Sequence, residues 1–214
     1  MTEVQEGSET VYIIEGERRI TLEYYKNAVI HAFVPAAYYA AAIRALGSDE
    51  VDTVGVSRLF TMQQFLLRYE FFLDPEADTQ QLEKRAIASL IAYGALTESE
   101  GKITVVDRSR IGEIANLTAN ILESYLLVLL TARDKPSSFK QLPDDALARG
   151  RAMLAADELT RPESLNVVNL QTASKAYKEG DVLLAGPDGR FTVDSMLASE
   201  LIADLGALLR RPDA

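Results

Sequence analysis

One side chain in this sequence has the type that general acid–base catalysis most often uses: His31, the only histidine in the chain. A catalytic imidazole needs a carboxylate to orient it and a nucleophile within reach. On a helix through this region, Asn27 and Pro35 lie one turn away and Tyr24 lies two turns before. No Asp or Glu occupies a position three or four residues to either side. We therefore interpret His31 as a hydrogen-bonded structural residue of an apolar segment.

Acidic residues are the other groups that could take part in proton transfer, and they are plentiful. None of the acidic pairs lies in an apolar pattern that would raise the pKa of a carboxyl group, so we expect them on solvated faces. The pairs are Glu70 with Asp74, Asp144 with Asp145, and Asp157 with Glu158.

Further catalytic and ligand-binding motifs are missing from the sequence. The stretch GPDGR at 186–190 lies within a predicted hairpin and lacks the strand, loop and helix of a phosphate-binding loop. No G-x-S-x-G nucleophile elbow occurs. With no cysteine and one histidine, the chain has too few ligands for a typical zinc site. The residues themselves support no catalytic group, no metal site and no cofactor; an enzyme using His31 would need the fold to bring a carboxylate to it.

The charge balance argues against nucleic acid as a partner. The chain has 214 residues and a net charge of −10, so a polyanion would be repelled unless basic residues gathered locally. They are scattered singly or in pairs, as at Arg18–Arg19 and Arg210–Arg211. The lack of cysteine fits a reducing compartment, and the acidic N-terminus is unlike a secretory signal. We expect a cytoplasmic protein.

The most apolar stretch is ITLEYYKNAVIHAFVPAAYYAAAIRAL, residues 20–46. Thr21 is a suitable N-cap, so the pattern predicts a helix over 22–45. Pro35 removes the bond to the carbonyl of His31 and predicts a kink or break there. Its apolar run, 28–43, is shorter than the roughly 20 residues that span a bilayer, so no transmembrane helix is predicted.

Elsewhere the sequence predicts an α+β protein that is predominantly helical, with two small β-hairpins near 96–106 and 181–193. We expect a disordered N-terminus over 1–10, a first helical unit over 11–135 and a second over 136–210. A short strand is predicted at 11–15, and helices are predicted at 56–72, 80–96, 111–132, 145–159, 161–177 and 194–210.

A helix, a glycine and a hairpin follow one another twice, over 80–106 and 163–193. This order is typical of the end of a winged-helix unit, so two winged-helix-like units are one interpretation of the chain. An adaptor or transcriptional module is then the alternative function. The hairpins carry few basic residues, among them Lys102 and Arg190, so contact with nucleic-acid phosphates would be weak.

Several stretches, taken in order, resemble one family: the region downstream of the catalytic domain in the large, bacterial-type glycerol-3-phosphate acyltransferases. The similarity spans about 11–205, and its most distinctive piece is Arg-Pro-Glu-Ser at 161–164. The stretches are RRITLEYYKNAVIHAFVPAA (18–37), FLLRYEFFLDPEAD (65–78), YGALTES (93–99), SYLLVLLTA (124–132) and RPESLNVVNLQTASKAYKEGDV (161–182).

The sequence departs from this family where the chemistry lies. The family uses a His-x-x-x-x-Asp motif to activate the glycerol-3-phosphate hydroxyl, whereas here Ala36 stands five residues after His31, and no Pro-Glu-Gly-Thr segment occurs. The resemblance therefore implies a non-catalytic region, a fragment or a separate subunit, that supports or regulates an acyltransferase domain in phospholipid synthesis. No activity is expected from the chain in isolation.

The resemblance also implies partners and candidate residues. The expected partner is the acyltransferase catalytic domain, in cis or in trans, with peripheral contact at the inner membrane. The apolar helix 22–45 would bury part of its surface against that partner or the membrane and would be exposed without it. The docking or structural candidates are Tyr24, Tyr25, Asn27, His31, Pro35, Glu70, Glu163 and Ser164.

Overall fold

The computed structural model describes residues 2–6, 9–13, 30–159 and 161–210. The chain divides into two compact units, Met1–Phe33 and Val34–Ala214. The first contains an antiparallel hairpin, in which Thr2 lies opposite Ile13, and one turn of 3-10 helix. The predicted boundaries at residues 10 and 135 stay predictions. The elements of this unit are β1 (Thr2–Glu6), β2 (Glu9–Ile13) and η1 (Ile30–Ala32).

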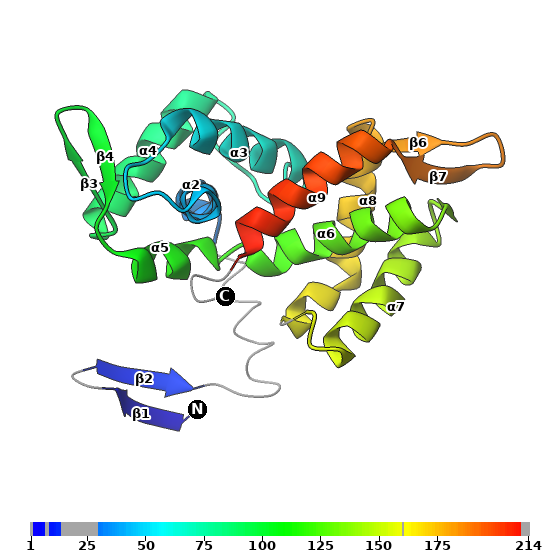
Figure 1. Cartoon of the computed structure of the whole chain (residues 1–214), viewed down its shortest axis with the longest axis horizontal. Coiled ribbons are helices and arrows are strands. Elements are labelled where there is room, and N and C mark those ends of the chain that lie inside the picture. The colour runs from blue at the N-terminus through cyan, green and yellow to red at the C-terminus, as the bar shows by residue number, and fades with distance from the viewer. Residues whose placement is uncertain (1, 7–8, 14–29, 160, 211–214) are drawn as a thin grey trace. The chain divides into compact units, whose positions relative to one another are not determined.

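The second unit is mainly helical, as predicted, with two small antiparallel sheets (Figure 1). The hairpins predicted near 96–106 and 181–193 are confirmed as β3–β4 and β6–β7. Its elements are α2 (Val34–Leu46), α3 (Thr53–Leu66), α4 (Thr79–Ala92), β3 (Leu96–Ser99), β4 (Lys102–Val105), α5 (Arg108–Ala115), α6 (Ala119–Asp134), β5 (Ser137–Ser138), α7 (Leu142–Ala155), η2 (Pro162–Leu165), α8 (Val167–Glu179), β6 (Leu183–Ala185), β7 (Arg190–Val193) and α9 (Ser195–Leu209).

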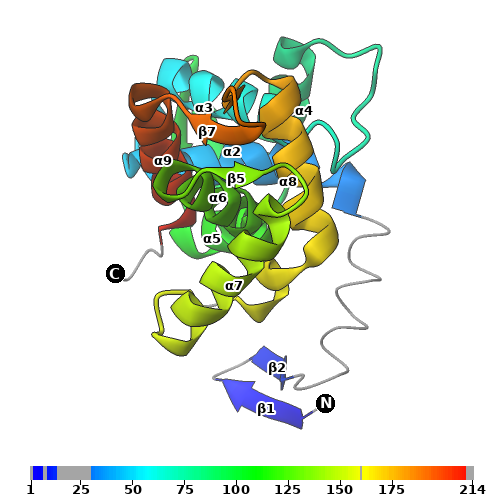
Figure 2. The same ribbon diagram turned by 90° about the vertical axis from the view of Figure 1, so that its right-hand side faces the viewer.

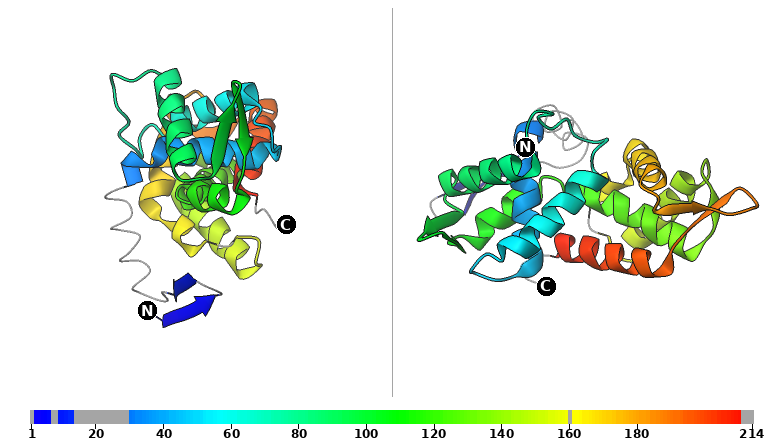
Figure 3. Two further views of the ribbon diagram at one scale, coloured as in Figure 1. Left: turned by 90° about the vertical axis from the view of Figure 1, so that its left-hand side faces the viewer. Right: turned by 90° about the horizontal axis from the view of Figure 1, so that it is seen from above.

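The same order of elements occurs twice in this unit. In the first repeat, α2 leads to a one-residue bridge at Glu50, then α3, α4 and the hairpin, and Glu50 pairs with Thr104 of β4. In the second, α6 leads to β5, then α7, α8 and the hairpin, and β5 pairs with β7. In both repeats the short early segment therefore pairs with the later strand of the hairpin. The hairpins project at opposite ends of the unit (Figures 1 and 3).

A further helix closes each repeat. After the first hairpin, Asp107 accepts a hydrogen bond from the backbone N–H of Arg110 and caps α5, which packs on α2. After the second, Asp194 accepts from Met196 and Leu197 and caps α9, which packs on α6. These matching caps place each helix start directly after a hairpin strand. Figure 2 shows β5 and β7 with α7 and α8. A winged-helix identity for the repeats stays a prediction.

Helix α2 forms the centre of the first repeat and contacts α3, α4, α5 and α9. From Ala36 to Ile43 every side chain is at most 6 % exposed. Several of these residues are alanines, which let the neighbouring helices approach closely. The expectation that this part of the apolar segment is exposed for a partner is therefore wrong for 34–43, because the chain's own helices already cover it. The predicted residues 22–29 lie outside the described part.

The break predicted at Pro35 is present. The 3-10 turn ends at Ala32, and α2 begins at Val34, so the proline occupies the first turn of a new helix. There its missing N–H costs no intrahelical hydrogen bond. The sequence pattern was right about the effect of the proline.

The helix predicted over 111–132 is two helices, α5 and α6, bent by 61° at the turn 116–118. In this turn the backbone N–H of Leu117 donates to Ile114, and that of Ala119 to Asn116. Within the described ranges, no single helix is long and apolar enough to span a membrane, although α5 and α6 together reach that length and composition.

Candidate functional site

Glu123 lies in the middle of α6. Among the described residues that form an ion pair, it has the most buried side chain. Its two carboxylate oxygens accept hydrogen bonds from different residues. The guanidinium of Arg161 donates to Oε1, and the hydroxyl of Ser164 donates to Oε2 at 2.5 Å. The hydroxyl of Ser124 in turn donates to the backbone carbonyl of Ser164 at 2.6 Å. The segment 161–164 is thereby fixed onto α6.

Two further residues extend this cluster to the other repeat. Asn116, at the end of α5, accepts hydrogen bonds at Oδ1 from Arg161 (3.2 Å) and from Arg44 of α2 (2.8 Å). Arg44 also donates to the carbonyl of Leu208 in α9 at 2.5 Å. We call Arg44, Asn116, Glu123, Arg161 and Ser164 the Glu123 cluster. It joins both repeats through side chains, and both carboxylate oxygens of Glu123 are engaged.

The electrostatics of the Glu123 cluster favour a structural role. Burial, together with the nearby positive charge of Arg161, lowers the pKa of Arg44 to about 10, so the guanidinium stays charged at neutral pH. Glu123 is 6 % exposed and both its oxygens accept hydrogen bonds from residues of the chain, so a substrate cannot reach this carboxylate. The hydroxyl of Ser164 donates to a carboxylate with no histidine between them, so the cluster lacks a catalytic triad. Its geometry suits it to hold helices together.

A second polar contact lies at the end of α3. The phenol of Tyr125 donates to Oε1 of Glu70 at 3.2 Å, and the ring of Tyr125 packs edge-on against that of Tyr177. Burial raises the pKa of Glu70 to about 7, partly offset by the hydrogen bond from Tyr125. The expectation that the Glu70 carboxyl is an ordinary solvated group is therefore wrong, because it is partly buried and accepts a hydrogen bond from Tyr125 of α6.

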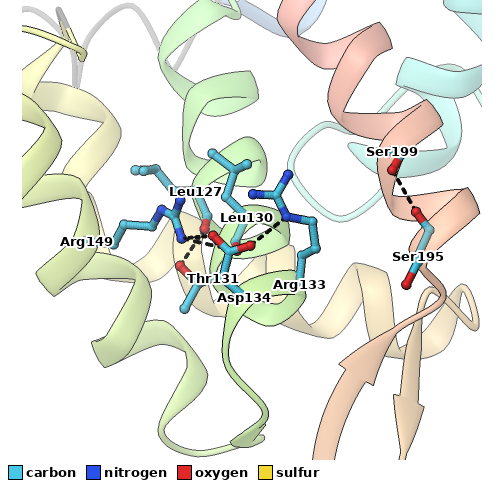
Figure 4. Close-up of polar contacts among 8 residues, drawn as sticks. All are labelled: Leu127, Leu130, Thr131, Arg133, Asp134, Arg149, Ser195 and Ser199. Atoms are coloured by element: carbon cyan, nitrogen blue, oxygen red, sulfur yellow. Dashed lines mark hydrogen bonds and ion pairs between the residues drawn. The ribbon is translucent and has the colours of Figure 1, made fainter.

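A third contact fixes the C-terminal end of α6 (Figure 4). Asp134 accepts from Arg149 of α7 at 2.8 Å and from Arg133 at 2.6 Å, and these hydrogen bonds lower the pKa of Asp134 to about 2. Arg149 also donates to the carbonyl of Leu130 at 3.2 Å. A cation there complements the unpaired carbonyls at a helix C-terminus.

The sequence matches one protein-family model over residues 1–185, and that model describes the glycerol-3-phosphate acyltransferase C-terminal region. The match covers most of the chain. The chain belongs to this family. The resemblance that the ordered stretches indicated is therefore confirmed. Within this acyltransferase C-terminal region, the distinctive Arg-Pro-Glu-Ser segment provides two members of the Glu123 cluster.

The candidates predicted from the sequence do not form one site in this acyltransferase C-terminal region. Ser164 belongs to the Glu123 cluster, and Glu70 lies beside Tyr125. Glu163 lies in η2, His31 in η1 and Pro35 in the first turn of α2. The remaining candidates, Tyr24, Tyr25 and Asn27, lie outside the described residues. Among the residues described, no group of three or more His, Cys, Asp or Glu could hold a metal ion.

Glu123, Asn116 and Arg44 are not among the residues predicted from the sequence. One signal for Glu123 was present: it is the single charged residue in the otherwise uncharged stretch 119–132. A charge at such a position predicts a buried, paired group. Its partner Arg161 is 38 residues away in sequence, so no spacing rule for helices or strands identifies it.

Proposed function

We propose that this chain acts as a non-catalytic region that supports or regulates a glycerol-3-phosphate acyltransferase domain in phospholipid synthesis. The family to which the chain belongs supports this proposal, because the matching model describes the C-terminal region of glycerol-3-phosphate acyltransferase. The partner is the acyltransferase domain, in the same chain or in another. We further propose a cytoplasmic location with peripheral contact at the inner membrane.

One observation carries the non-catalytic part of the proposal. The chain has one histidine, and the position five residues after it is Ala36 instead of the aspartate that the family's reaction uses. Ala36 is 6 % exposed, within the first turns of α2, so a carboxylate there would be buried. The His-x-x-x-x-Asp motif is therefore absent from this sequence.

The ion pairs of the first repeat favour contact with protein over contact with nucleic acid. We interpret each repeat as winged-helix-like, with α4 and α8 as the third helices. On α4, Arg85 is paired with Asp74, and the hairpin residue Lys102 is paired with Glu50. These ion pairs leave little positive charge on α4 and the first hairpin for the phosphates of a nucleic acid. We therefore propose protein contacts as the use of this fold.

The test is reconstitution with a separately produced catalytic domain from a family member that carries the His-x-x-x-x-Asp motif. We expect the two chains to co-elute in size-exclusion chromatography. We also expect the chain to change the thermal stability or the turnover of the catalytic domain. A catalytic domain that neither binds the chain nor changes in stability or turnover would overturn the proposal.

A further inference from the structure

A pocket of about 430 Å³ lies between the start of α7 and the exposed face of α8. Its walls combine apolar surface with cations, and no acidic residue lines it. Asp144 follows a lining residue in sequence but is not itself part of the wall. The lining residues are Phe139, Lys140, Pro143, Gln171, Ser174 and Lys175.

This composition is unusual for the chain, in which acidic residues outnumber basic ones by 32 to 22. Lys140 is exposed and forms no ion pair within the described residues, and Lys175 lies 4.0 Å from Glu179 and 4.4 Å from the ring centre of Tyr69. A third cation, Lys178, lies 4.7 Å from the ring centre of Phe139. The pocket is therefore a local region of positive potential beside an aromatic surface.

The first repeat has a pocket in the equivalent place, and it has different chemistry. It lies along α3, the second helix of its repeat, and includes Glu83 of the third helix. There Arg58, the one cation, donates two hydrogen bonds to Asp204 of α9. The wall of the first-repeat pocket thus contains an acid and a cation that is paired with Asp204. The wall of the α7–α8 pocket contains no acid, and its Lys140 forms no ion pair within the described residues. The repeat provides an internal control for the contribution of charge.

We propose that the α7–α8 pocket binds a phosphate monoester whose organic part lies against Phe139 and Pro143. Two lysines without an acidic neighbour in the wall match the charge of a phosphate monoester, which approaches −2 at pH 7. Lysine binds phosphate as a point charge. The amide of Gln171 adds a neutral hydrogen-bond donor. The proposal does not depend on the proposed support of an acyltransferase domain.

The probe is phenyl phosphate, titrated into the ¹⁵N-labelled chain and followed by amide chemical shifts. We expect saturable shifts at the start of α7 and along α8, with a Kd of about 1 mM or tighter. Inorganic phosphate, which lacks the aromatic part, should bind at least about threefold more weakly. No saturable shift, or equal affinity for the two probes, overturns the proposal.

Variants assign the binding to the pocket. Lys140→Gln with Lys175→Gln should weaken phenyl phosphate binding at least about tenfold, since two cations are lost. Gln171→Glu gives this pocket the acid of its first-repeat counterpart and should weaken binding at least about fivefold. These side chains are exposed, so an unchanged melting temperature verifies that the variants fold. Unchanged affinity in both variants overturns the proposal.

Matched controls separate a local site from general charge attraction. Lys84→Gln with Lys102→Gln removes the same charge elsewhere, and Glu83→Gln changes the first-repeat pocket. Both should retain the affinity of the unaltered chain; a loss equal to that of the α7–α8 variants would overturn the assignment.

Sedimentation with phosphatidylcholine vesicles that contain phosphatidic acid distinguishes a phosphate group carried by a lipid from one carried by a free ester. If the chain binds these vesicles and the binding needs Lys140 and Lys175, the ligand is a lipid-borne phosphate. If the chain binds phenyl phosphate but not the vesicles, the ligand is a free ester. Either result supports binding of a phosphate monoester in the pocket.

Discussion

The phenol of Tyr125 in α6 donates a hydrogen bond to the carboxyl group of Glu70, which follows α3, at 3.2 Å. The contact joins elements of the two repeats across 55 positions of sequence. Burial raises the pKa of Glu70 from 4.5 to about 7. The folded state therefore holds a proton on Glu70 over a pH range in which the unfolded chain has lost it.

This difference gives stability a definite dependence on pH. Because the folded pKa lies above the unfolded one, the contribution of Glu70 to stability falls as pH rises from about 4.5 to about 7. Each pKa unit corresponds to about 1.4 kcal/mol, and partial exposure reduces this, so we expect a loss of about 2 kcal/mol. Glu70→Gln removes the titration. Relative to the unaltered chain it should be about 2 kcal/mol more stable at pH 8 and nearly equal at pH 4.5, in urea unfolding followed by circular dichroism.

Glu98→Gln is the matched control, because Glu98 is an exposed acid on β3. Its difference from the unaltered chain should be small at both pH values. If Glu70→Gln showed the same free energy difference at pH 4.5 and pH 8, the burial of the Glu70 carboxyl would be contradicted.

The Glu123 cluster predicts a large effect from one buried side chain. Glu123→Ala removes the carboxylate that accepts hydrogen bonds from the guanidinium of Arg161 and the hydroxyl of Ser164. Breaking a buried pair in this way should lower the free energy of unfolding by about 3 kcal/mol. Ser164→Ala removes one hydrogen bond and should cost about 1 kcal/mol. Urea denaturation of the purified variants measures both.

Arg58→Ala provides the comparison, because the ion pair of Arg58 with Asp204 lies at the surface, with the Arg58 side chain 60 % exposed. This substitution should cost at most about 1 kcal/mol. Equal costs for Glu123→Ala and Arg58→Ala would contradict a structural role for the cluster.

The enclosure of α2 predicts that small residues on it cannot be enlarged. Ala41 is fully buried among the helices that contact α2, so Ala41→Leu should cost about 1–3 kcal/mol through overpacking. Ala92→Leu places the same bulk at the exposed end of α4 and should be nearly neutral. Differential scanning calorimetry of the two variants tests this. A neutral Ala41→Leu would indicate that α2 is not enclosed by the chain itself.

Local chemistry explains which parts of the fold the sequence predicts. The turn Gly-Pro-Asp-Gly predicts the second hairpin, where Gly189 adopts a φ of 73° that favours glycine. Pro35 likewise predicts the break before α2. The division between α5 and α6 is not predictable in this way, because apolar residues continue at helical spacing through the turn.

The polar sites are harder to predict than the elements, for a physical reason. Glu123 has its partners 38 and 41 residues away, and Glu70 is paired with Tyr125. Such contacts depend on how helices pack, and neither residue type nor local spacing determines this. The burial that raises the pKa of Glu70 is a property of the assembled fold.

The most direct measurement for the non-catalytic assignment is acyl transfer by the purified chain alone. Radiolabelled glycerol-3-phosphate is incubated with acyl-CoA or with acyl-carrier protein, and the acylated product is counted. Because the one histidine has no aspartate at the family's spacing, we expect product at the level of a reaction without protein, and an identical result for His31→Asn. Turnover by the chain that His31→Asn abolishes would contradict the account.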